Sequence, residues 1–334
     1  MLFFSSLIMS TLISISSYSW MSMWIGLEIN ALSIIPILIN QKNKISSEAA
    51  IKYFFTQAIA STVIMFAIIT MMSQFNQSTK MLSDWAMMIM NSSFLMKMGM
   101  APFHFWFPEV LEGLSWMNSL LMLTWQKIAP MILLMYNIEF MNFIILAIIF
   151  SMIVSGLMAI NQISLRKIMA YSSINHMGWM LSSMITSKLI WLIYLSIYVI
   201  MTISIILILN FMNIFFISQL SSLWSMNLTM KLFFSFSMMS LAGIPPFIGF
   251  IPKWLTIQSL IAENFFIISL IMIMFTLIMI YVYMTMIMST LLFNFSANNW
   301  KISISQFKFN WPMSMFNFIM LSSFMFITLS FNLS

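Results

Sequence analysis

The sequence predicts an all-α integral membrane protein with about eleven transmembrane helices, two of them broken. Composition is the first observation: 62% of the residues are hydrophobic, 6% are charged and the mean hydropathy is +1.02. Soluble domains carry about 25% charged residues, so this chain has too little polar surface to fold in water. The second observation is a series of long uncharged runs, and the third is a pair of related motifs containing glycine and proline.

The uncharged runs set the positions of the predicted helices. A helix that crosses the hydrocarbon core of a bilayer needs about 20 apolar residues. No charged residue precedes Glu28, and the run 189–230 is long enough for one helix followed by a polar loop. The predicted helices are 2–18, 20–39, 48–73, 86–107, 114–136, 141–161, 168–186, 189–212, 230–261, 264–291 and 312–331.

Two related motifs interrupt the predicted helices 86–107 and 230–261. Both follow the pattern Gly-x-x-Pro-Phe-x4-Pro, and a lysine lies beside each one. Proline removes a backbone hydrogen bond and glycine adds backbone freedom, so the motifs predict breaks near 97–108 and 243–253. Two ordinary proline kinks are the simpler alternative, although packing alone does not explain a lysine at each break. The residues assigned to the breaks are Gly99, Pro102, Pro108, Gly243, Pro245, Pro246 and Pro252.

The spacing of the two motifs predicts an inverted repeat. Gly99 and Gly243 are 144 residues apart. About five predicted helices lie between equivalent points, and an odd number of spans inverts the second copy relative to the first. Many secondary transporters are built in this way, with the ion path at mid-depth beside paired interrupted helices. The predicted units are a five-helix repeat at 1–139, a second at 140–292, and a loop with a C-terminal transmembrane helix at 293–334.

Four charged residues fall inside predicted helices rather than in loops. They are Glu28, Lys97, Lys127 and Lys253. A charge at the bilayer centre costs about 2.5–3.5 kcal/mol on insertion scales, so four unpaired charges would cost about 10 kcal/mol. Such groups pair or face water, and by default they mark function. A single lysine could serve structure alone by pairing or by extending to the interface, but the set of four favours function.

Proton transfer is the chemistry that these residues suit. Burial lowers the pKa of a lysine by up to about 3–5 units, so a buried lysine can release its proton near neutral pH. Glu28 with Lys97 predicts a switch, because a nearby carboxylate favours the protonated lysine. Other polar side chains are candidate relays, although a lone histidine in a helix bundle is more often a structural donor. These candidates are His104, His176, Gln126, Ser172 and Ser173.

Composition also excludes several functions. The chain has no cysteine, which excludes thiolate-bound iron–sulfur clusters and cysteine zinc sites, and its two histidines are far apart. We therefore expect no cofactor and no metal site in this chain. No glycine-rich nucleotide motif occurs. The net charge of +6 indicates a topology bias rather than nucleic-acid binding, which needs a clustered basic face.

Lysine and arginine in the predicted loops set the expected orientation. The N-terminal side receives most of these cations, and the other side receives Lys80 and Lys188. An excess of basic residues marks the loops of the positive-inside compartment. The N-terminus is therefore predicted to face that compartment and the C-terminus to lie on the opposite side.

Several stretches resemble a known family, the animal type of subunit 2 of mitochondrial NADH–ubiquinone oxidoreductase, or respiratory complex I, within the antiporter-like subunits. The resemblance covers most of the chain and is weakest over the last ~40 residues. The stretches that carry it are Trp24–Asn30, Glu48–Gln57, Lys97–Glu109, Thr124–Lys127, Leu165–Ser173, His176–Trp179 and Gly243–Trp254.

The resemblance implies a proton channel in the membrane arm of complex I, driven by electron transfer in other subunits. Glu28 and Lys97 match the family's glutamate–lysine pair, Lys127 its central lysine, and Lys253 its lysine at the second broken helix. The NADH, FMN, iron–sulfur and ubiquinone sites would belong to other subunits. The implied partners are neighbouring antiporter-like subunits and membrane lipids. The implied location is the mitochondrial inner membrane, with the N-terminus in the matrix and the C-terminus in the intermembrane space.

Two other functions fit parts of the sequence. A stand-alone cation/proton antiporter would share the architecture, but short loops and the lack of a soluble domain favour a subunit of a larger assembly. A structural scaffold without a proton path would tie neighbouring subunits together, but the charges predicted at mid-membrane argue against it.

Overall fold

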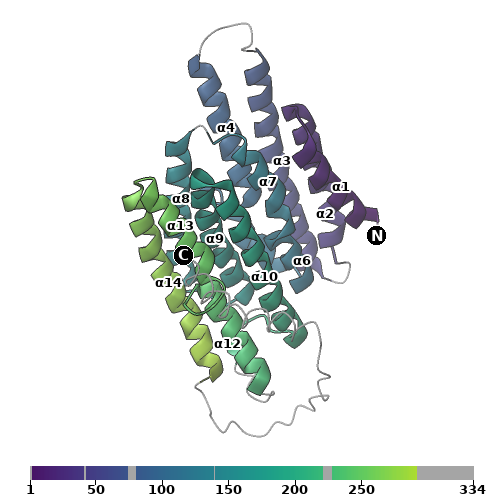
Figure 1. The fold of residues 1–334 in the computed structure, drawn as a ribbon. Coiled ribbons are helices and arrows are strands. Elements are labelled where there is room, and N and C mark those ends of the chain that lie inside the picture. The colour runs from purple at the N-terminus through teal and green to yellow at the C-terminus, as the bar shows by residue number, and fades with distance from the viewer. Residues whose placement is uncertain (1, 41–42, 74–79, 139, 221–227, 292–334) are drawn as a thin grey trace.

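The computed structural model describes residues 2–40, 43–73, 80–138, 140–220 and 228–291 (Figure 1). The described chain is all-helical, which confirms the predicted class. The predicted helix 312–331 and the unit 293–334 lie outside the described residues. The helices are α1 (Leu2–Ser16), α2 (Trp20–Leu38), α3 (Lys44–Ser73), α4 (Lys80–Met98), α5 (Trp106–Gly113), α6 (Trp116–Leu123), α7 (Trp125–Met135), α8 (Met141–Ala159), α9 (Leu165–Thr186), α10 (Lys188–Met212), α11 (Ile217–Leu220), α12 (Leu228–Ala242), α13 (Phe250–Ala262) and α14 (Phe266–Leu291).

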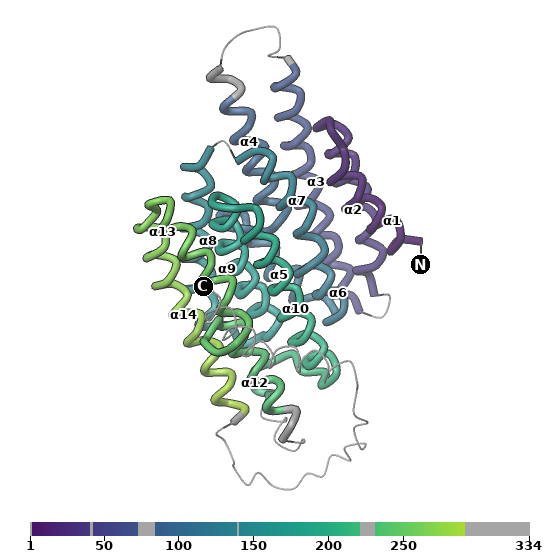
Figure 2. The backbone as a smooth tube through the Cα atoms, viewed as in Figure 1, coloured from purple at the N-terminus to yellow at the C-terminus, as the bar shows by residue number. Residues whose placement is uncertain are grey.

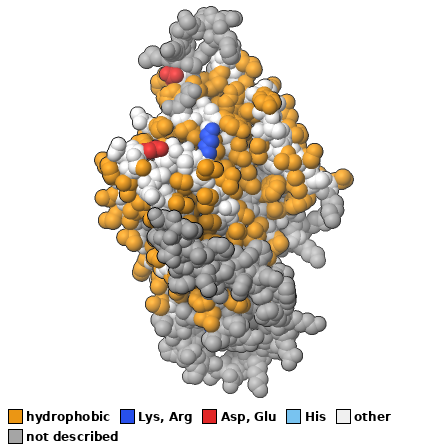
Figure 3. Space-filling view, viewed as in Figure 1, with side chains coloured by type: hydrophobic (Ala, Val, Ile, Leu, Met, Phe, Trp, Pro, Cys, Tyr) orange, Lys and Arg blue, Asp and Glu red, His pale blue; other side chains and the backbone are white. Residues whose placement is uncertain are grey.

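Five of the described helices are long and apolar enough to cross a membrane, judged by length and composition. Large apolar side chains cover the outside of the molecule, and Figure 3 shows one face with few charged groups among them. A soluble protein rarely exposes so large an apolar patch. The five segments are Trp20–Leu38, Lys44–Met72, Met141–Ala159, Lys188–Met212 and Phe266–Thr290.

The helices form two neighbouring groups (Figures 1 and 2). In the first group α2 packs against α1 and α3, and α4 packs against α3 and α7. In the second group α14 packs against α8 and α12, while α10 packs against α9 and α12. Contacts of α5 with α9 and of α6 with α10 join the groups. The first half of the chain therefore meets the second half along α9 and α10.

Helix α9 is the centre of the bundle. Every residue from Ile168 to Met184 is buried, and α9 contacts α5, α6, α8, α10, α13 and α14. A helix that is buried on all sides usually carries an apolar sequence. This one instead buries several polar side chains, which include Ser172, Asn175 and His176. Their position places them between the two groups of helices.

The structure corrects two predicted helices. The segment 86–107 contains the break but is too short at both ends, because α4 begins at Lys80 and the second half-helix, α5, continues to Gly113. The segment 114–136 is not continuous, because α6 ends at Leu123 and α7 begins at Trp125. Between them the Thr124 hydroxyl donates to the Leu120 carbonyl at 2.8 Å. Back-bonding of this kind often bends a helix.

Candidate functional site

The two motifs end α4 and α12 in the same way. Gly99 and Gly243 follow these helices with φ angles of +70° and +77°. The Met100 N–H donates to the Leu95 carbonyl at 3.0 Å, and an equivalent bond closes the end of α12. This is a Schellman ending, in which glycine is favoured because it adopts positive φ without a steric penalty. Each half-helix therefore stops inside the bundle.

The prolines of the motifs take two different places. Pro102, Pro245 and Pro246 lie in the loops between the half-helices, and the Ala101–Pro102 and Pro245–Pro246 peptide bonds are cis. The structure corrects the assignment of the other two prolines, Pro108 and Pro252, to the breaks. Each is the third residue of the second half-helix, α5 or α13. Proline is tolerated there because the first N–H groups of a helix have no intrahelical partner.

Lys97 lies in the last turn of α4, just before the first break. Its side chain is buried, and Nζ has no hydrogen-bond partner within the described part of the chain. It lines a small cavity with Asn30, Tyr53, Gln57 and Gln126. The volume of the cavity is about 10 Å³, which is close to what a single water molecule needs. The cavity is polar enough to hold one.

A hydrogen-bonded network surrounds this cavity. Gln126 Nε2 donates to Asn30 Oδ1 at 3.1 Å, and the Tyr53 hydroxyl donates to Gln126 Oε1 at 3.5 Å. Gln57 Nε2 donates to the Lys97 carbonyl at 3.4 Å. The groups come from α2, α3, α4 and α7, so the packing of four helices creates this polar site. Gln126 was a predicted relay residue, and it does lie beside Lys97.

Glu28 lies on α2 and is partly buried. Its carboxylate is close enough for its charge to act on both Lys97 and Tyr53. No ion pair joins Glu28 to Lys97, and the ion pairs found among the described residues involve other groups. The structure therefore brings the two residues into electrostatic range without direct contact.

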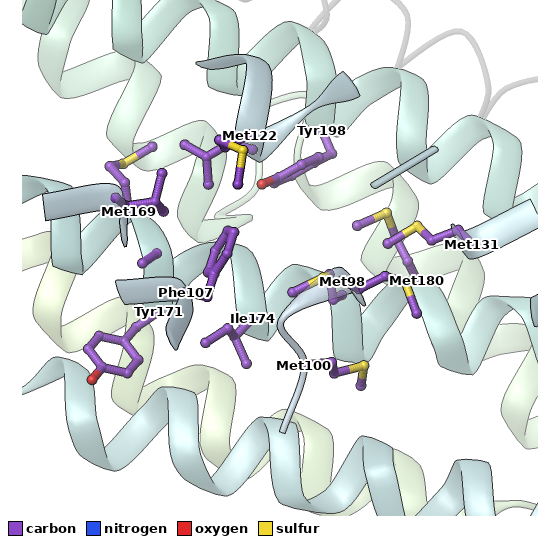
Figure 4. Close-up of a cluster of buried hydrophobic side chains, with 14 of the residues drawn as sticks. Met98, Met100, Phe107, Met122, Met131, Met169, Tyr171, Ile174, Met180 and Tyr198 are labelled. Atoms are coloured by element: carbon purple, nitrogen blue, oxygen red, sulfur yellow. The ribbon is translucent and has the colours of Figure 1, made fainter. Parts of the chain in front are cut away.

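Lys127 lies in α7, immediately after the interruption at Thr124, and is buried. Its Nζ donates to the Tyr198 hydroxyl at 3.5 Å. The same nitrogen lies 5.1 Å from the centre of the Phe107 ring and 5.4 Å from that of Tyr198. Figure 4 shows both rings within the buried cluster. Aromatic faces attract cations, so the two rings offset part of the cost of burying the charge.

His176 lies within electrostatic range of two of the lysines, Lys127 and Lys253. One ring nitrogen, Nδ1, is hydrogen-bonded to the Tyr194 hydroxyl at 2.9 Å, and the ring centre is 5.2 Å from that of Tyr198. The other nitrogen, Nε2, is buried, and the backbone of Leu241 lies near enough to interact with the ring. The charges of Lys127 and Lys253 both act on this imidazole. His176 therefore lies near enough to both lysines to feel their charges.

Ser172 and Ser173 lie one turn before His176 on α9. Their hydroxyls donate to the Met169 and Ala170 carbonyls, both at 2.7 Å. Ser173 also lies beside the Tyr198 hydroxyl, and Ser172 lies beside that of Tyr283.

Sequence reasoning did not single out Tyr194, Tyr198 or Tyr283. The spacing of Tyr194 and Tyr198 in the sequence is a signal that could have identified these two. Tyr194 and Tyr198 are four residues apart in an otherwise apolar helix, so they share a face. Asn30 and Tyr53 were also missed as members of the network around Lys97.

Lys253 lies in the first turn of α13, across the second break from α12. Its Nζ donates to the Ala242 carbonyl at 2.7 Å. Ala242 is the last residue of α12, whose carbonyl end carries a partial negative charge. The lysine therefore binds the end of the half-helix that the break creates.

His104 is less connected than the other predicted residues. It is buried in the loop of the first break. Its Nδ1 lies 3.3 Å from the Pro102 carbonyl, and its ring centre lies 4.3 Å from that of Phe105. These contacts are all within the same loop. The structure therefore does not bring His104 into the groups around the three lysines.

Methionines form part of the buried core near Phe107 and Tyr198. Figure 4 shows Met98, Met100, Met131 and Met180 close together, with Phe107 and Tyr198 nearby. All four methionines are buried. Methionine has a flexible and polarizable side chain that adapts to changes of shape. This cluster is therefore an apolar but deformable part of the core.

These observations define a class of protein. An all-helical molecule with an apolar exterior, two half-helix ends inside the bundle and three buried lysines has the features of an ion-translocating membrane protein. Within the described residues, no cluster of histidine and acidic side chains could hold a metal ion.

Comparison with known proteins identifies the family. Residues 17–280 match the family described as NADH:quinone oxidoreductase/Mrp antiporter, transmembrane. NADH-ubiquinone oxidoreductase chain 2 of Anopheles gambiae is 43% identical over 98% of this chain and 96% of its own length. The corresponding chain of Aedes aegypti is 45% identical, again over 98% and 96%. The protein belongs to the NADH:quinone oxidoreductase/Mrp antiporter family, in the group of the NADH-ubiquinone oxidoreductase chains 2.

A solved structure supports the fold. A chain in the structure of respiratory complex I from Thermus thermophilus with bound aureothin superposes with a TM-score of 0.84. The match covers 96% of this chain and 76% of that chain, at 22% sequence identity. The helical arrangement is therefore shared, although few side chains are.

Proposed function

We propose that this chain is a proton-translocating membrane-arm subunit of NADH:ubiquinone oxidoreductase, respiratory complex I, driven by electron transfer in other subunits. One observation carries the proposal: three lysines are buried, two of them at helix breaks, in a chain whose full-length relatives are chains 2 of that enzyme. A buried lysine without a fixed carboxylate partner is costly to keep, and in a membrane such a residue marks function.

The proposed proton path follows the order Glu28, Lys97, Lys127, His176 and Lys253. The charge of Glu28 acts on Lys97, so a change at the carboxylate changes how strongly the lysine holds its proton. Gln126, in the cavity beside Lys97, is the sequence neighbour of Lys127. A water in that cavity would extend the path toward α7.

The second part of the path uses hydroxyl and imidazole groups. Tyr198 accepts a hydrogen bond from Lys127 and packs against His176, whose ring nitrogens can accept or donate a proton. Ser172 and Ser173 flank this region as further relay groups. Lys253 is the last station, and its bond to the Ala242 carbonyl fixes it beside the second break. His104 has the weakest case for a relay role, because its contacts lie within its own loop and, among the described residues, none reaches the lysine sites.

The finer architecture is also part of the proposal. Joining α4 with α5, α6 with α7, and α12 with α13, and leaving out the four-residue α11, gives ten spans in the order found. The segment 312–331 would be the eleventh. Two repeats, 1–139 and 140–292, would each contain one broken helix. The matching positive φ angles of Gly99 and Gly243 support their equivalence.

Location and partners follow from the same proposal. The chain would lie in the mitochondrial inner membrane as a multi-pass protein, with its N-terminus in the matrix and its C-terminus in the intermembrane space. Its partners would be other membrane-arm subunits, in particular neighbouring antiporter-like subunits, and membrane lipids. Cofactors would be held by those other subunits and not by this chain. The full-length match to complex I chains does not favour a stand-alone antiporter.

Replacement of Lys127 tests the function. We expect Lys127→Ala to leave assembly of the complex intact and to lower NADH oxidation coupled to proton pumping by about tenfold or more, since one acid–base group contributes about 10²–10⁴-fold. Lys188→Ala is the matched control, because Lys188 is an exposed lysine at the start of α10. The measurement is protons pumped and NADH oxidised by the assembled enzyme in vesicles. Normal pumping by assembled Lys127→Ala enzyme would remove the central role of this residue.

A further inference from the structure

A cavity far from the lysine path lies at one end of the bundle. Its volume is about 340 Å³, and it lies where α2 and α5 end and α3, α6 and α9 begin. Part of the wall is apolar and includes Leu38, Ile45 and Phe216. The rest is polar and includes Asn118 and Arg166. The proposed proton path uses none of these residues.

Arg166 supplies a positive charge to this cavity. Its Nη1 donates to the Leu114 carbonyl at 2.6 Å, and the Phe215 ring lies 4.8 Å from the guanidinium carbon. A guanidinium has five N–H donors. Within the described part of the chain, Nη1 is the guanidinium nitrogen with a hydrogen-bond partner, and Nε is buried without one. The side chain is therefore held in place, and most of its N–H donors have no partner among the described residues.

Two helices begin in the wall of the same cavity. Ile45 and Ser46 belong to the first turn of α3, and Ser115 is the residue that caps α6. The Ser115 side chain makes no capping hydrogen bond. The first N–H groups of a helix lack intrahelical partners, and this end of the helix carries a partial positive charge. Both helix ends therefore add to the charge of Arg166. The carbonyl ends of α2 and α5 lie in the same wall and carry partial negative charge, but Asn118 donates to the Ile37 carbonyl and Arg166 to the Leu114 carbonyl.

The acidic residue in the described wall does not cancel this charge. Glu112 lines the cavity, but its carboxylate is paired with Lys167 Nζ at 2.8 Å. Lys44 lies between the lining residues Asn43 and Ile45 and is exposed. The electrostatic balance at the cavity is therefore positive.

We propose that this cavity binds a phosphate-bearing anion. Guanidinium and helix N-termini are preferred partners of phosphate, because both present several N–H donors to one charged group. The anion could be the phosphate group of an anionic membrane lipid or free phosphate. The apolar wall and the position at the end of the helices favour the lipid, whose glycerol and acyl groups would lie against Phe216. This inference does not depend on the proton path.

A matched pair of substitutions at Ser115 gives the sharpest test. Asp and Asn are equally good helix caps, so Ser115→Asp and Ser115→Asn should both preserve α6. They differ by one negative charge in the cavity wall. Arg166→Gln is a second variant, and Lys188→Gln controls for loss of a cation at the opposite end of the bundle. The Ser115 pair decides the question even if the Arg166 variant fails to assemble.

The complete complex carrying each variant is reconstituted into phosphatidylcholine vesicles that contain a photoactivatable phosphatidic acid. Crosslinks are mapped by mass spectrometry to the segments around Asn118 and Phe216. We expect labelling in the unmodified, Ser115→Asn and Lys188→Gln proteins. Labelling should fall about tenfold in Ser115→Asp and Arg166→Gln, the order expected when a charge-assisted hydrogen bond is lost.

Radiolabelled inorganic phosphate provides the second arm, with the same variants in detergent. Lipid labelling that depends on the charge at position 115 supports the site and identifies the lipid as the source. Phosphate binding with the same dependence, but without lipid labelling, supports the site and identifies free phosphate as the source. Equal results for Ser115→Asp and Ser115→Asn in both arms, or no binding in either arm, would overturn the proposal. Proton pumping is not a readout, so failure here leaves the proposed function untouched.

Discussion

At the scale of single residues, the three buried lysines are held in three different ways. Lys97 Nζ has no hydrogen-bond partner within the described residues, Lys127 Nζ contacts a hydroxyl and two aromatic rings, and Lys253 Nζ binds a main-chain carbonyl. A hydrogen bond to a charged group contributes about 1.5–3 kcal/mol. The ammonium of Lys97 is therefore the least stabilised by direct contacts, and it is also the one on which the charge of Glu28 acts.

Removal of the Tyr198 hydroxyl tests the link between Lys127 and His176. We expect Tyr198→Phe to keep the ring packing and to lower coupled turnover about tenfold. The lost hydroxyl accepts a hydrogen bond from a charged donor, the Lys127 ammonium. Tyr281→Phe is the control, since Tyr281 is 61% exposed on α14. The measurement is NADH-driven proton pumping, together with the amount of assembled complex. If the two variants pump equally well, Tyr198 is not part of the path.

The sequence predicted which residues carry charge at this site but not all of the groups they contact. Lys97, Lys127 and Lys253 are visible in the sequence because a charge in an apolar run is rare. Tyr198 is not visible in this way, because its role depends on which helices pack against α10. The periodicity of the sequence indicates which face of α10 is buried, but not which helices lie against that face. His104 looked equivalent to His176 in sequence, but the first makes local contacts and the second bridges helices.

At the scale of helices, the two breaks depend on glycines that also leave room for functional side chains. A Cβ atom at Gly243 would lie 2.9 Å from Lys253 Nζ, and one at Gly99 would lie 2.8 Å from Phe107 Cβ. The positive φ of both positions adds a steric cost of about 1–2 kcal/mol for other residues. Each glycine therefore fixes both the end of its helix and the place of the residue that packs against it.

Substitution of Gly243 tests this double role. We expect Gly243→Ala to displace Lys253 and to lower both the yield of assembled complex and its pumping. Gly156→Ala is the control, because Gly156 lies within α8 and a Cβ there would approach Phe275 Cδ1 at 3.3 Å, a contact that a small ring movement can relieve. Assembly is measured by native electrophoresis and pumping in vesicles. Normal pumping by Gly243→Ala would show that the position of Lys253 tolerates movement.

The helix breaks illustrate what sequence can predict at this scale. The motifs located both breaks, because glycine and proline act locally on the backbone. They did not distinguish loop prolines from Pro108 and Pro252, because proline is equally compatible with a loop and with the first turn of a helix. The interruption at Thr124 was missed, since a threonine inside an apolar run is common in membrane helices.

At the scale of the whole molecule, exposed ion pairs gather at the end where α3 begins. Lys52 pairs with Glu48 at 3.1 Å and with Glu109 at 3.0 Å, and Glu112 pairs with Lys167 at 2.8 Å. The last two pairs tie α5 to α3 and α9. Exposed pairs contribute only about 0–1 kcal/mol each, so their main effect is to position the short half-helix.

The orientation of the chain gives a prediction at this scale. Lys44 and Lys188 are both exposed, and they lie at the starts of α3 and α10, at opposite ends of the bundle. An amine reagent that does not cross membranes should label Lys188 in mitochondria whose outer membrane has been removed. Lys44 should react only after the inner membrane is opened. Labelling of Lys44 from outside would mean that the N-terminus does not face the matrix.

The class of the molecule was the part most fully predictable from sequence. An apolar chain with few charges has few ways to satisfy its backbone in lipid, and helices are the main one. The pairing of helices was not predictable, because contacts such as α5 with α9 join segments that are distant in sequence. The cavity beside Arg166 belongs to this unpredicted part, since five helix ends create it.

The contact between Lys253 and Ala242 couples the charge of the lysine to the position of the end of α12. The ammonium group of the lysine binds the buried carbonyl end of α12, and a charged donor binds about twice as strongly as a neutral one. When the lysine loses its proton, its hydrogen bond to the Ala242 carbonyl weakens. The two halves of the interrupted helix, α12 and α13, are then held together less strongly. Loss of one proton would thereby allow α12 and α13 to move relative to each other. Such a movement could reach neighbouring subunits without any proton passing to them.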